Sequence, residues 1–385
     1  MVIAQVALSV LLLLCAGLSV RSWWNANRID PGFDAEGVAV ARFLPDTQGY
    51  DQQQADELFR RMEERLLHSP GVDSVAFALR PPLSFNEINV FGIHPVDRGE
   101  PPKVLPFVDF NLITPGYFET LRIPFLEGRD FTEHDTSSSA RVVIVSQALA
   151  QRFWPDEPAL GRQLYVDDFR HPWTAEVVGV VADTKHRTLG ESPRPIFYWP
   201  YAQDAFSWRM VLVRSRSPQR ALALIRQVTR ELDEDLAITG LETLEETTGR
   251  QALLLPRVSA KLFGLLGLIG LILATIGIYA VMAYSVSQRQ HEIGVRVAMG
   301  AKPGQVVRLV LRRGVVLTTC GIVLGVVGGL IVTWVLSAIL YGISATDLVT
   351  FLAVPLALAG VSLTACWIPA QRAASVDPLE TLRCE

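Results

Sequence analysis

Four long runs without a charged residue constrain this chain more than any other feature. They cover residues 1–20, 262–284, 314–336 and 348–371. A bilayer core of about 30 Å needs roughly 20 helical residues at about 1.5 Å each, and every run meets that length. The sequence therefore predicts four transmembrane helices. Half of the residues are apolar, which is typical of a membrane protein.

The first run has a second interpretation, which is a signal peptide that is cleaved. No charged segment precedes the run, and it is longer than the apolar core of such a peptide usually is. Arg21, Ser22, Trp23 and Trp24 follow it. Basic and aromatic residues together are typical of a helix end at the membrane interface, not of a cleavage site. We therefore favour a membrane anchor.

The charges fall into two regions of opposite sign. Residues 30–256 hold 23 Lys+Arg against 34 Asp+Glu, a net charge of −11, and the other residues carry a net charge of +7. The short loop 285–313 holds six basic residues and one acid. Short basic loops stay in the cytoplasm, so we expect this loop and the tail 372–385 inside and residues 30–256 outside. An acidic domain repels a polyanion, which excludes nucleic acid as a partner.

The outer region reads as two β-α-β units with a long insert between them. The strands and helices that we expect lie at 38–44, 51–67 and 74–79, and again at 210–214, 218–232 and 237–241. The insert, roughly 84–205, contains short strands and a helix near 146–153. Two such units around an insert indicate a split ferredoxin-like fold. The predicted fold class is a membrane protein with four transmembrane α-helices and a large α+β extracytoplasmic domain of two lobes.

Sequence signals for catalysis are absent. The dipeptide Gly-Lys, which a Walker A phosphate loop requires, occurs nowhere, and neither does a Gly-x-Ser-x-Gly or His-Glu-x-x-His motif. The four cysteines, Cys15, Cys320, Cys366 and Cys384, all lie outside residues 30–256, so the outer domain contains no disulfide. We expect no catalytic residue, no metal site and no cofactor in this chain.

The cytoplasmic loop carries the most informative segment, QRQHEIGVRVAMGAK at 288–302. Charged residues share one face of a short helix there, apolar residues share another, and a glycine ends it. We interpret it as a docking element for a cytoplasmic partner, and a basic helix on anionic headgroups is the alternative. The candidate docking residues are Arg289, Glu292, Ile293, Gly294, Arg296 and Gly300.

Small residues also recur within the predicted spans. Gly321, Gly325 and Gly329 are spaced four apart, and Gly264, Gly267 and Gly270 are spaced three apart. Such a pattern lets two helix backbones approach closely. Packing within the four-helix unit and an interface between two subunits both remain open.

Several segments together resemble the MacB/FtsX-type ABC transporter permeases. In the membrane part they are IGIYAVMAYSVSQR (276–289), EIGVRVAMGAKPGQVVRLVLRRG (292–314) and PAQRAASVDPLETLR (369–383). In the outer part they are TPGYFETLRIPFLEGRDF (114–131), VSQALAQRFWP (145–155) and VVGVVADTKH (177–186). The details are most similar to the duplicated orphan permeases (the ADOP group), which hold two such halves in one chain. This sequence has a single permease unit and begins within its first span, so we leave open whether it is half of a longer permease.

The resemblance implies a domain layout. Residues 1–21 would form the first transmembrane helix, residues 30–256 a periplasmic MacB-like core domain, and residues 257–385 an FtsX-like permease domain. The transmembrane helices of that last domain would lie at about 262–284, 314–340 and 348–369. The resemblance also implies location in the inner membrane, a dimer of permease units, and a separate ABC ATPase that docks on the loop.

The function that follows is that of a permease subunit, which couples ATP hydrolysis on the partner to export or to mechanical work outside the membrane. The alternative is a regulatory membrane protein of the FtsX kind, which controls a periplasmic enzyme without transport. A membrane-anchored enzyme or receptor is a third reading. The sequence does not name a substrate.

Overall fold

The computed structural model describes most of the chain, which divides into two compact units. One unit holds residues 1–28 and 254–385, and the other holds residues 29–253. The described residues are 2–26, 28–83, 90–168, 171–204, 206, 208–288, 303–336 and 347–374.

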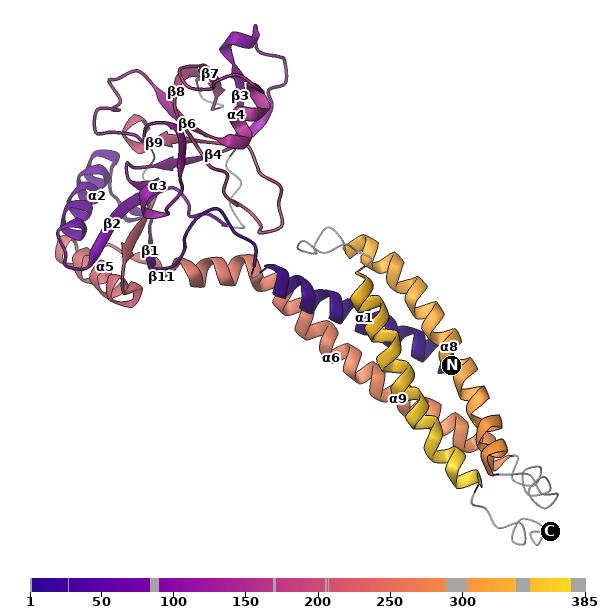
Figure 1. Cartoon of the computed structure of the whole chain (residues 1–385). Helices are drawn as coiled ribbons and strands as arrows, with labels where there is room; N and C mark the ends of the chain where they lie inside the picture. The colour runs from indigo at the N-terminus through magenta and orange to yellow at the C-terminus, as the bar shows by residue number, and fades with distance from the viewer. Residues whose placement is uncertain are drawn as a thin grey trace. The chain divides into compact units, whose positions relative to one another are not determined.

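Residues 29–253 form an α/β domain of two lobes, the first of which we call the porter lobe (Figure 1). Its strand order is β11-β1-β10-β2, with every neighbouring pair antiparallel. This is the order of a ferredoxin-like fold, which confirms the predicted fold class. Its elements are β1 (Val38–Phe43), α2 (Gln52–Leu67), β2 (Val72–Ala78), β10 (Arg209–Ser215), α5 (Pro218–Leu232) and β11 (Ile238–Thr243).

Helix α2 shows why the local sequence adopts this fold. Asp51 caps it in a capping box, because its side chain accepts from the backbone N–H of Gln54 at 2.8 Å while the Gln54 side chain accepts from the backbone N–H of Asp51 at 2.9 Å. The apolar side chains recur at helical spacing and pack into one core with α5 and the sheet. The buried ones on α2 are Ala55, Leu58, Phe59, Met62 and Leu66.

The second lobe, which we call the insert lobe, corresponds to the α+β insert that the sequence predicts. Its strands follow the order β4-β3-β7-β8-β6-β9, and β9 also pairs with β4, so the strands close into a barrel. Closure leaves these strands without a free edge. The strands are β3 (Val90–Pro95), β4 (Phe107–Ile113), β6 (Val142–Ser146), β7 (Gln163–Asp167), β8 (Trp173–Val181) and β9 (Ile196–Pro200). Strand β5 (Phe125–Gly128) pairs with β8, and α4 (Gln147–Phe153) completes the lobe. Helix α3 (Tyr117–Thr120) packs on β2 and β10 of the porter sheet.

Few strand-to-strand contacts join the two lobes. Strands β2 and β4 are paired at one position, Ala78 with Ile113. The backbone N–H of Leu79 donates to Leu112 at 2.8 Å, and that of Thr114 donates to Phe77 at 2.9 Å. Each lobe has its own buried apolar cluster. The domain therefore consists of two separately packed bodies joined by a narrow junction.

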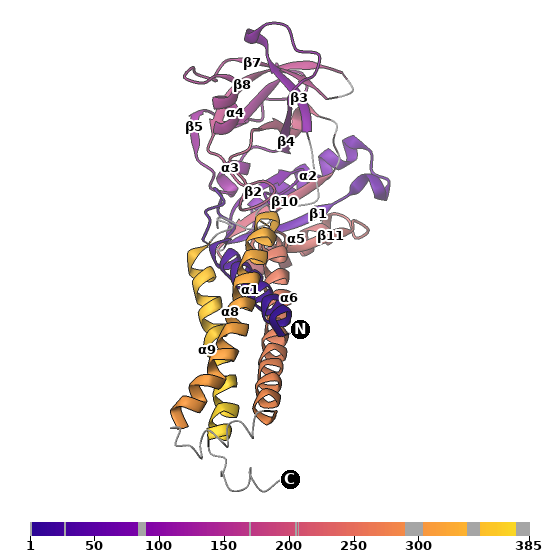
Figure 2. The ribbon, with the colours of Figure 1, turned by 90° about the vertical axis from the view of Figure 1, so that its right-hand side faces the viewer.

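The other unit contains the membrane helices α1 (Val2–Ala26), α8 (Pro303–Leu336) and α9 (Leu348–Ala374), together with most of α6 (Leu244–Ser287). Each holds a segment long and apolar enough to cross a membrane, which confirms the four predicted spans. The share of residues buried in that segment is 44% for α1 and 22% for each of the other three. Helix α1 is therefore the inner helix of the unit, and Figure 2 shows it beside the others.

Candidate functional site

Helix α8 packs on α1 through the glycine stripe. A Cβ added to Gly321, Gly325 or Gly329 would lie 2.6 Å from a side-chain carbon of α1. Real Cβ contacts are longer. A Cβ on Gly321 or Gly325 would also lie close to the α1 backbone, 3.2 Å from the oxygen of Ile3 or 2.7 Å from that of Ala7, so these two positions require glycine. At Gly329 the near atom is the end of a Leu side chain, which can move. The residues of α1 that the three glycines meet are Val6, Val10 and Leu14 respectively. We propose that the stripe serves packing within the four-helix unit.

Helix α6 approaches α1 in the same way. A Cβ on Gly270 would lie 3.1 Å from Ser9 Oγ, and one on Gly277 would lie 2.7 Å from Gln5 Oε1. Gly264, by contrast, faces open space, with no atom within 4 Å of an added Cβ. Helices α6 and α8 thus both pack closely on α1 at glycine positions.

We expect Gly325→Ala to destabilise the membrane unit by about 1–3 kcal/mol, since the added methyl overpacks a close contact. It would meet both the Val10 side chain and the backbone oxygen of Ala7, at 2.7 Å. Gly264→Ala is the matched control, and it should leave stability unchanged or raise it by up to about 1 kcal/mol through helix propensity. Thermal unfolding in detergent measures both. Equal shifts for the two variants would contradict the packing assignment.

The N-terminal end of α9 is tied to α1. Asp347 accepts from the backbone N–H of Thr350 at 2.9 Å and from its hydroxyl at 2.7 Å, which caps the helix. Arg21 of α1 forms an ion pair with the same carboxylate. A Cβ on Gly17 would lie 2.7 Å from Thr350 Cγ2, so all three other helices contact α1 closely.

The candidate docking residues lie outside the described residues. Helix α6 ends at Ser287 and α8 begins at Pro303, so the described structure stops on both sides of the segment. Arg289, Glu292, Ile293, Gly294, Arg296 and Gly300 therefore stay predictions from the sequence.

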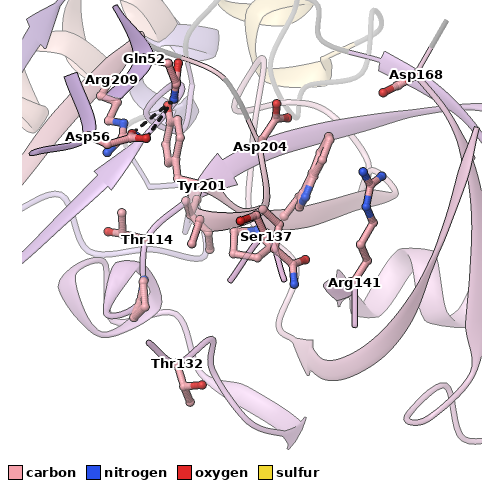
Figure 3. A pocket seen from close by; sticks show the side chains of 16 residues that line it. Gln52, Asp56, Thr114, Thr132, Ser137, Arg141, Asp168, Tyr201, Asp204 and Arg209 are labelled. Carbon is pink, nitrogen blue, oxygen red and sulfur yellow. Dashed lines mark hydrogen bonds and ion pairs between the residues drawn. The ribbon is translucent and has the colours of Figure 1, made fainter. Parts of the chain in front are cut away.

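The extracytoplasmic domain has a cleft of about 640 Å³ between its lobes (Figure 3). On the porter side, the Arg209 guanidinium lies 4.5 Å from the centroid of the Tyr201 ring and 5.0 Å from that of Phe59, and it forms an ion pair with Asp56. Arg141 lies on the insert side, 4.9 Å from the ring centroid of Trp173. Sequence reasoning missed these residues, although Arg209 next to a buried apolar strand was an available signal.

Glu63 lies on α2, seven residues beyond Asp56, and its pKa is raised to about 7. Burial is the main cause, because it disfavours the charged carboxylate, and the charges of Glu133 and Glu64 add to it while Arg209 opposes it. A carboxyl whose pKa is higher in the folded state stabilises the fold below the unfolded pKa, and this contribution is lost as the pH rises through the folded pKa.

Glu63→Gln should therefore raise the thermal midpoint relative to the parent at pH 8 and have little effect at pH 4. The expected gain in free energy of unfolding is about 1–3 kcal/mol, as one pKa unit corresponds to about 1.4 kcal/mol. Scanning fluorimetry of both proteins across this pH range measures it. Glu100→Gln, at an exposed position outside the helix, is the control. A constant difference between Glu63→Gln and its parent from pH 4 to pH 8 would contradict the assignment.

A buried arginine joins three parts of the domain. Arg214 of β10 donates to the backbone oxygen of Thr120 at 2.6 Å, of Asp34 at 2.7 Å and of Glu36 at 2.8 Å. It also lies 3.3 Å from the Asp34 carboxylate, which Arg122 approaches at 2.8 Å. Burial lowers the pKa of Arg214. The residue links strand β10 of the porter sheet to α3, which packs on that sheet, and to the segment that enters the domain.

Charged residues are also buried in the insert lobe. Asp109, 2% exposed, accepts from Arg187 at 2.5 Å and from Arg194 at 3.0 Å. The nearby His186 is buried, which lowers its pKa to about 3 and keeps the ring neutral. In the described ranges, no group of three or more His, Cys, Asp or Glu side chains has the arrangement of a metal site.

Two protein families match most of this chain. A family described as "MacB-like periplasmic core domain" matches residues 24–231, and one described as "FtsX-like permease C-terminal" matches residues 264–378. The solved periplasmic region of MacB from Actinobacillus actinomycetemcomitans is similar with a TM-score of 0.38 and 14% identity, over 56% of this chain and 92% of that one.

Among curated proteins, the chain is similar to the macrolide export ATP-binding/permease protein MacB of Marinobacter nauticus. The identity is 28% over 273 residues, which is 68% of this chain and 41% of that protein. It is also 25% identical to the uncharacterized ABC transporter permease YvrN of Bacillus subtilis, over 82% of each chain. The chain thus spans about two fifths of the length of the MacB relatives it matches.

Fold and membrane helices together define a multi-pass inner-membrane protein with a large extracytoplasmic domain. The chain belongs to the MacB/FtsX-type ABC transporter permease family, with a MacB-like periplasmic core domain and an FtsX-like permease domain.

Proposed function

We propose that this chain is the permease subunit of an ABC-type complex, in which a separate ATPase drives export or mechanical work outside the membrane. One observation carries the proposal, namely the presence in one chain of a MacB-like core domain and an FtsX-like permease domain. The related MacB proteins are named ATP-binding/permease proteins, whereas this sequence contains no Gly-Lys dipeptide for a Walker A loop. ATP hydrolysis would therefore occur on a partner chain.

The packing of the membrane helices supports a mechanical coupling. Residues 288–302 connect α6 to α8, and both helices approach α1 closely at glycine positions. Tightly packed helices move together, since the interior of a protein deforms little. A partner that moves the loop would thus move α1, whose chain continues directly into the extracytoplasmic domain at residue 29. Two copies of the permease would face one ATPase dimer, with the predicted docking residues 289–300 in contact with it.

Co-purification tests the proposal. The tagged chain, extracted from its native membrane in mild detergent, should retain an ATP-binding protein in fixed stoichiometry, and the purified chain alone should not hydrolyse ATP. A matched tagged membrane protein without an ABC partner serves as the control. Recovery of the chain with no ATP-binding protein, or saturable hydrolysis by the chain alone, would overturn the proposal.

A further inference from the structure

The cleft between the porter lobe and the insert lobe has the dimensions of a ligand site. Its volume of about 640 Å³ falls within the range of roughly 300–1,000 Å³ that is typical of small-molecule pockets. The side chains that form its inner surface are well ordered by packing, since Trp199 is 4%, Tyr201 3% and Arg209 7% exposed. Residues of both lobes line it, so a bound molecule would contact two separately packed bodies.

Arg141 is a cationic side chain of this cleft with no acidic partner among the described residues. Its side chain is exposed at the cleft, and its guanidinium is held over the Trp173 ring at 4.9 Å. It forms no ion pair with any residue that the structure describes, whereas Arg209 on the other wall is paired with Asp56. The two arginines lie apart in Figure 3, with Tyr201, Ser137 and Asp204 between them in that view.

The inner surface also presents aromatic rings. Arg209 and Trp199 line the cleft, and their side-chain N–H groups are buried within the wall without an acceptor among the described residues. Aromatic rings lie next to these donors, because Trp173 and Trp199 have their centroids 4.5 Å apart. The cleft thus offers an unpaired cation and apolar ring surface together.

We propose that the cleft binds a small amphiphilic monoanion, with an apolar body against Trp199 and Tyr201 and one carboxylate, sulfonate or phosphate monoester group at Arg141. The remaining carboxylates of the cleft limit the charge that it accepts. Asp168 and Asp204 also line it, and the whole domain carries a net charge of −11, so a polyanion is repelled. The inference concerns the extracytoplasmic domain alone, and its failure would leave the proposed ATPase partnership intact.

The test compares two probes that differ only in charge. Naphthaleneacetate carries a carboxylate, and naphthaleneacetamide replaces it with a neutral amide on the same ring system. Equilibrium dialysis against the full chain in phosphatidylcholine nanodiscs, with empty nanodiscs subtracted, gives both affinities. The acetate should bind about tenfold more tightly than the amide. Equal affinities, or no binding of either probe at millimolar concentration, would overturn the proposal.

Variants assign the binding to the cleft. Arg141→Gln should weaken the acetate about tenfold and leave the amide unchanged. Arg152→Gln is the matched control, because Arg152 is also exposed and stacks on an aromatic ring, 5.8 Å from Phe153, but lies outside the cleft lining. Ser137→Trp, at an exposed lining position, should block both probes and does not depend on the fold of the Arg141 variant. Identical effects of Arg141→Gln and Arg152→Gln, or full binding by Ser137→Trp, would contradict the site.

Discussion

Arg214→Ala is expected to lower the free energy of unfolding of the extracytoplasmic domain by about 3–5 kcal/mol, the usual cost of breaking a buried charged contact. The substitution removes the donor for three backbone oxygens and leaves Asp34 without one of its two cationic neighbours. Buried acceptors without partners are costly in free energy. The Arg214 side chain is 6% exposed, so water cannot take its place unless the three segments around it separate. Urea unfolding of the full chain, followed by tryptophan fluorescence, measures the loss.

Two further variants sharpen this result. Arg216→Ala removes an exposed arginine two residues along the chain and should change stability by less than about 0.5 kcal/mol. Arg214→Lys keeps the charge but not the planar fork of donors, so it should recover only part of the lost stability. If Arg214→Ala shifts the urea midpoint no more than Arg216→Ala does, Arg214 does not hold β10, α3 and the entering segment together.

The second large effect concerns docking of the ATPase. The double variant Glu292→Lys with Gly294→Trp should insert and fold normally but no longer retain its ATPase. In the helix that the sequence predicts here, Glu292→Lys would place like charges four residues apart with Arg296. Such a pair changes helix stability by only about 0.2–0.5 kcal/mol, so folding is expected to be maintained. Loss of a central interface contact costs a few kcal/mol, because a few residues carry most of the binding free energy.

The measurement is the fraction of ATPase that co-purifies with the variant relative to the parent. Arg250→Lys, a conservative change near the start of α6, serves as the control for expression and extraction. Full retention and full stimulation of the ATPase by the double variant would show that the loop does not dock it. The loop would then be better described as a basic helix on the membrane surface.

The elements with a local signal were predictable from the sequence. The four spans follow from length and apolarity, and α2 and α5 follow from apolar residues at helical spacing. The ferredoxin-like strand order of the porter lobe was predictable because two β-α-β units admit few topologies, and the structure confirms it. Glycine spacing indicated close helix approach, but only the structure shows that α1 is the helix approached.

Features formed by residues that lie far apart in the sequence were not predictable. Closure of the barrel depends on parallel pairing of Asp109 with Ile196 and of Ile113 with Pro200, and nothing in either strand encodes its partner. The bonds of Arg214 go to backbone oxygens, which carry no residue-specific signal. The cleft likewise joins Arg141 of one lobe to Arg209 of the other, so its chemistry exists only once both lobes have folded.

The most direct measurement of the central claim is the ATP hydrolysis rate of the partner ATPase with and without this chain in lipid nanodiscs. We predict that addition of the parent chain changes the rate and that the Glu292→Lys, Gly294→Trp double variant does not change it. We also predict that the chain alone hydrolyses no ATP. An ATPase rate that is the same with the parent chain, the double variant and empty nanodiscs would contradict the proposed function.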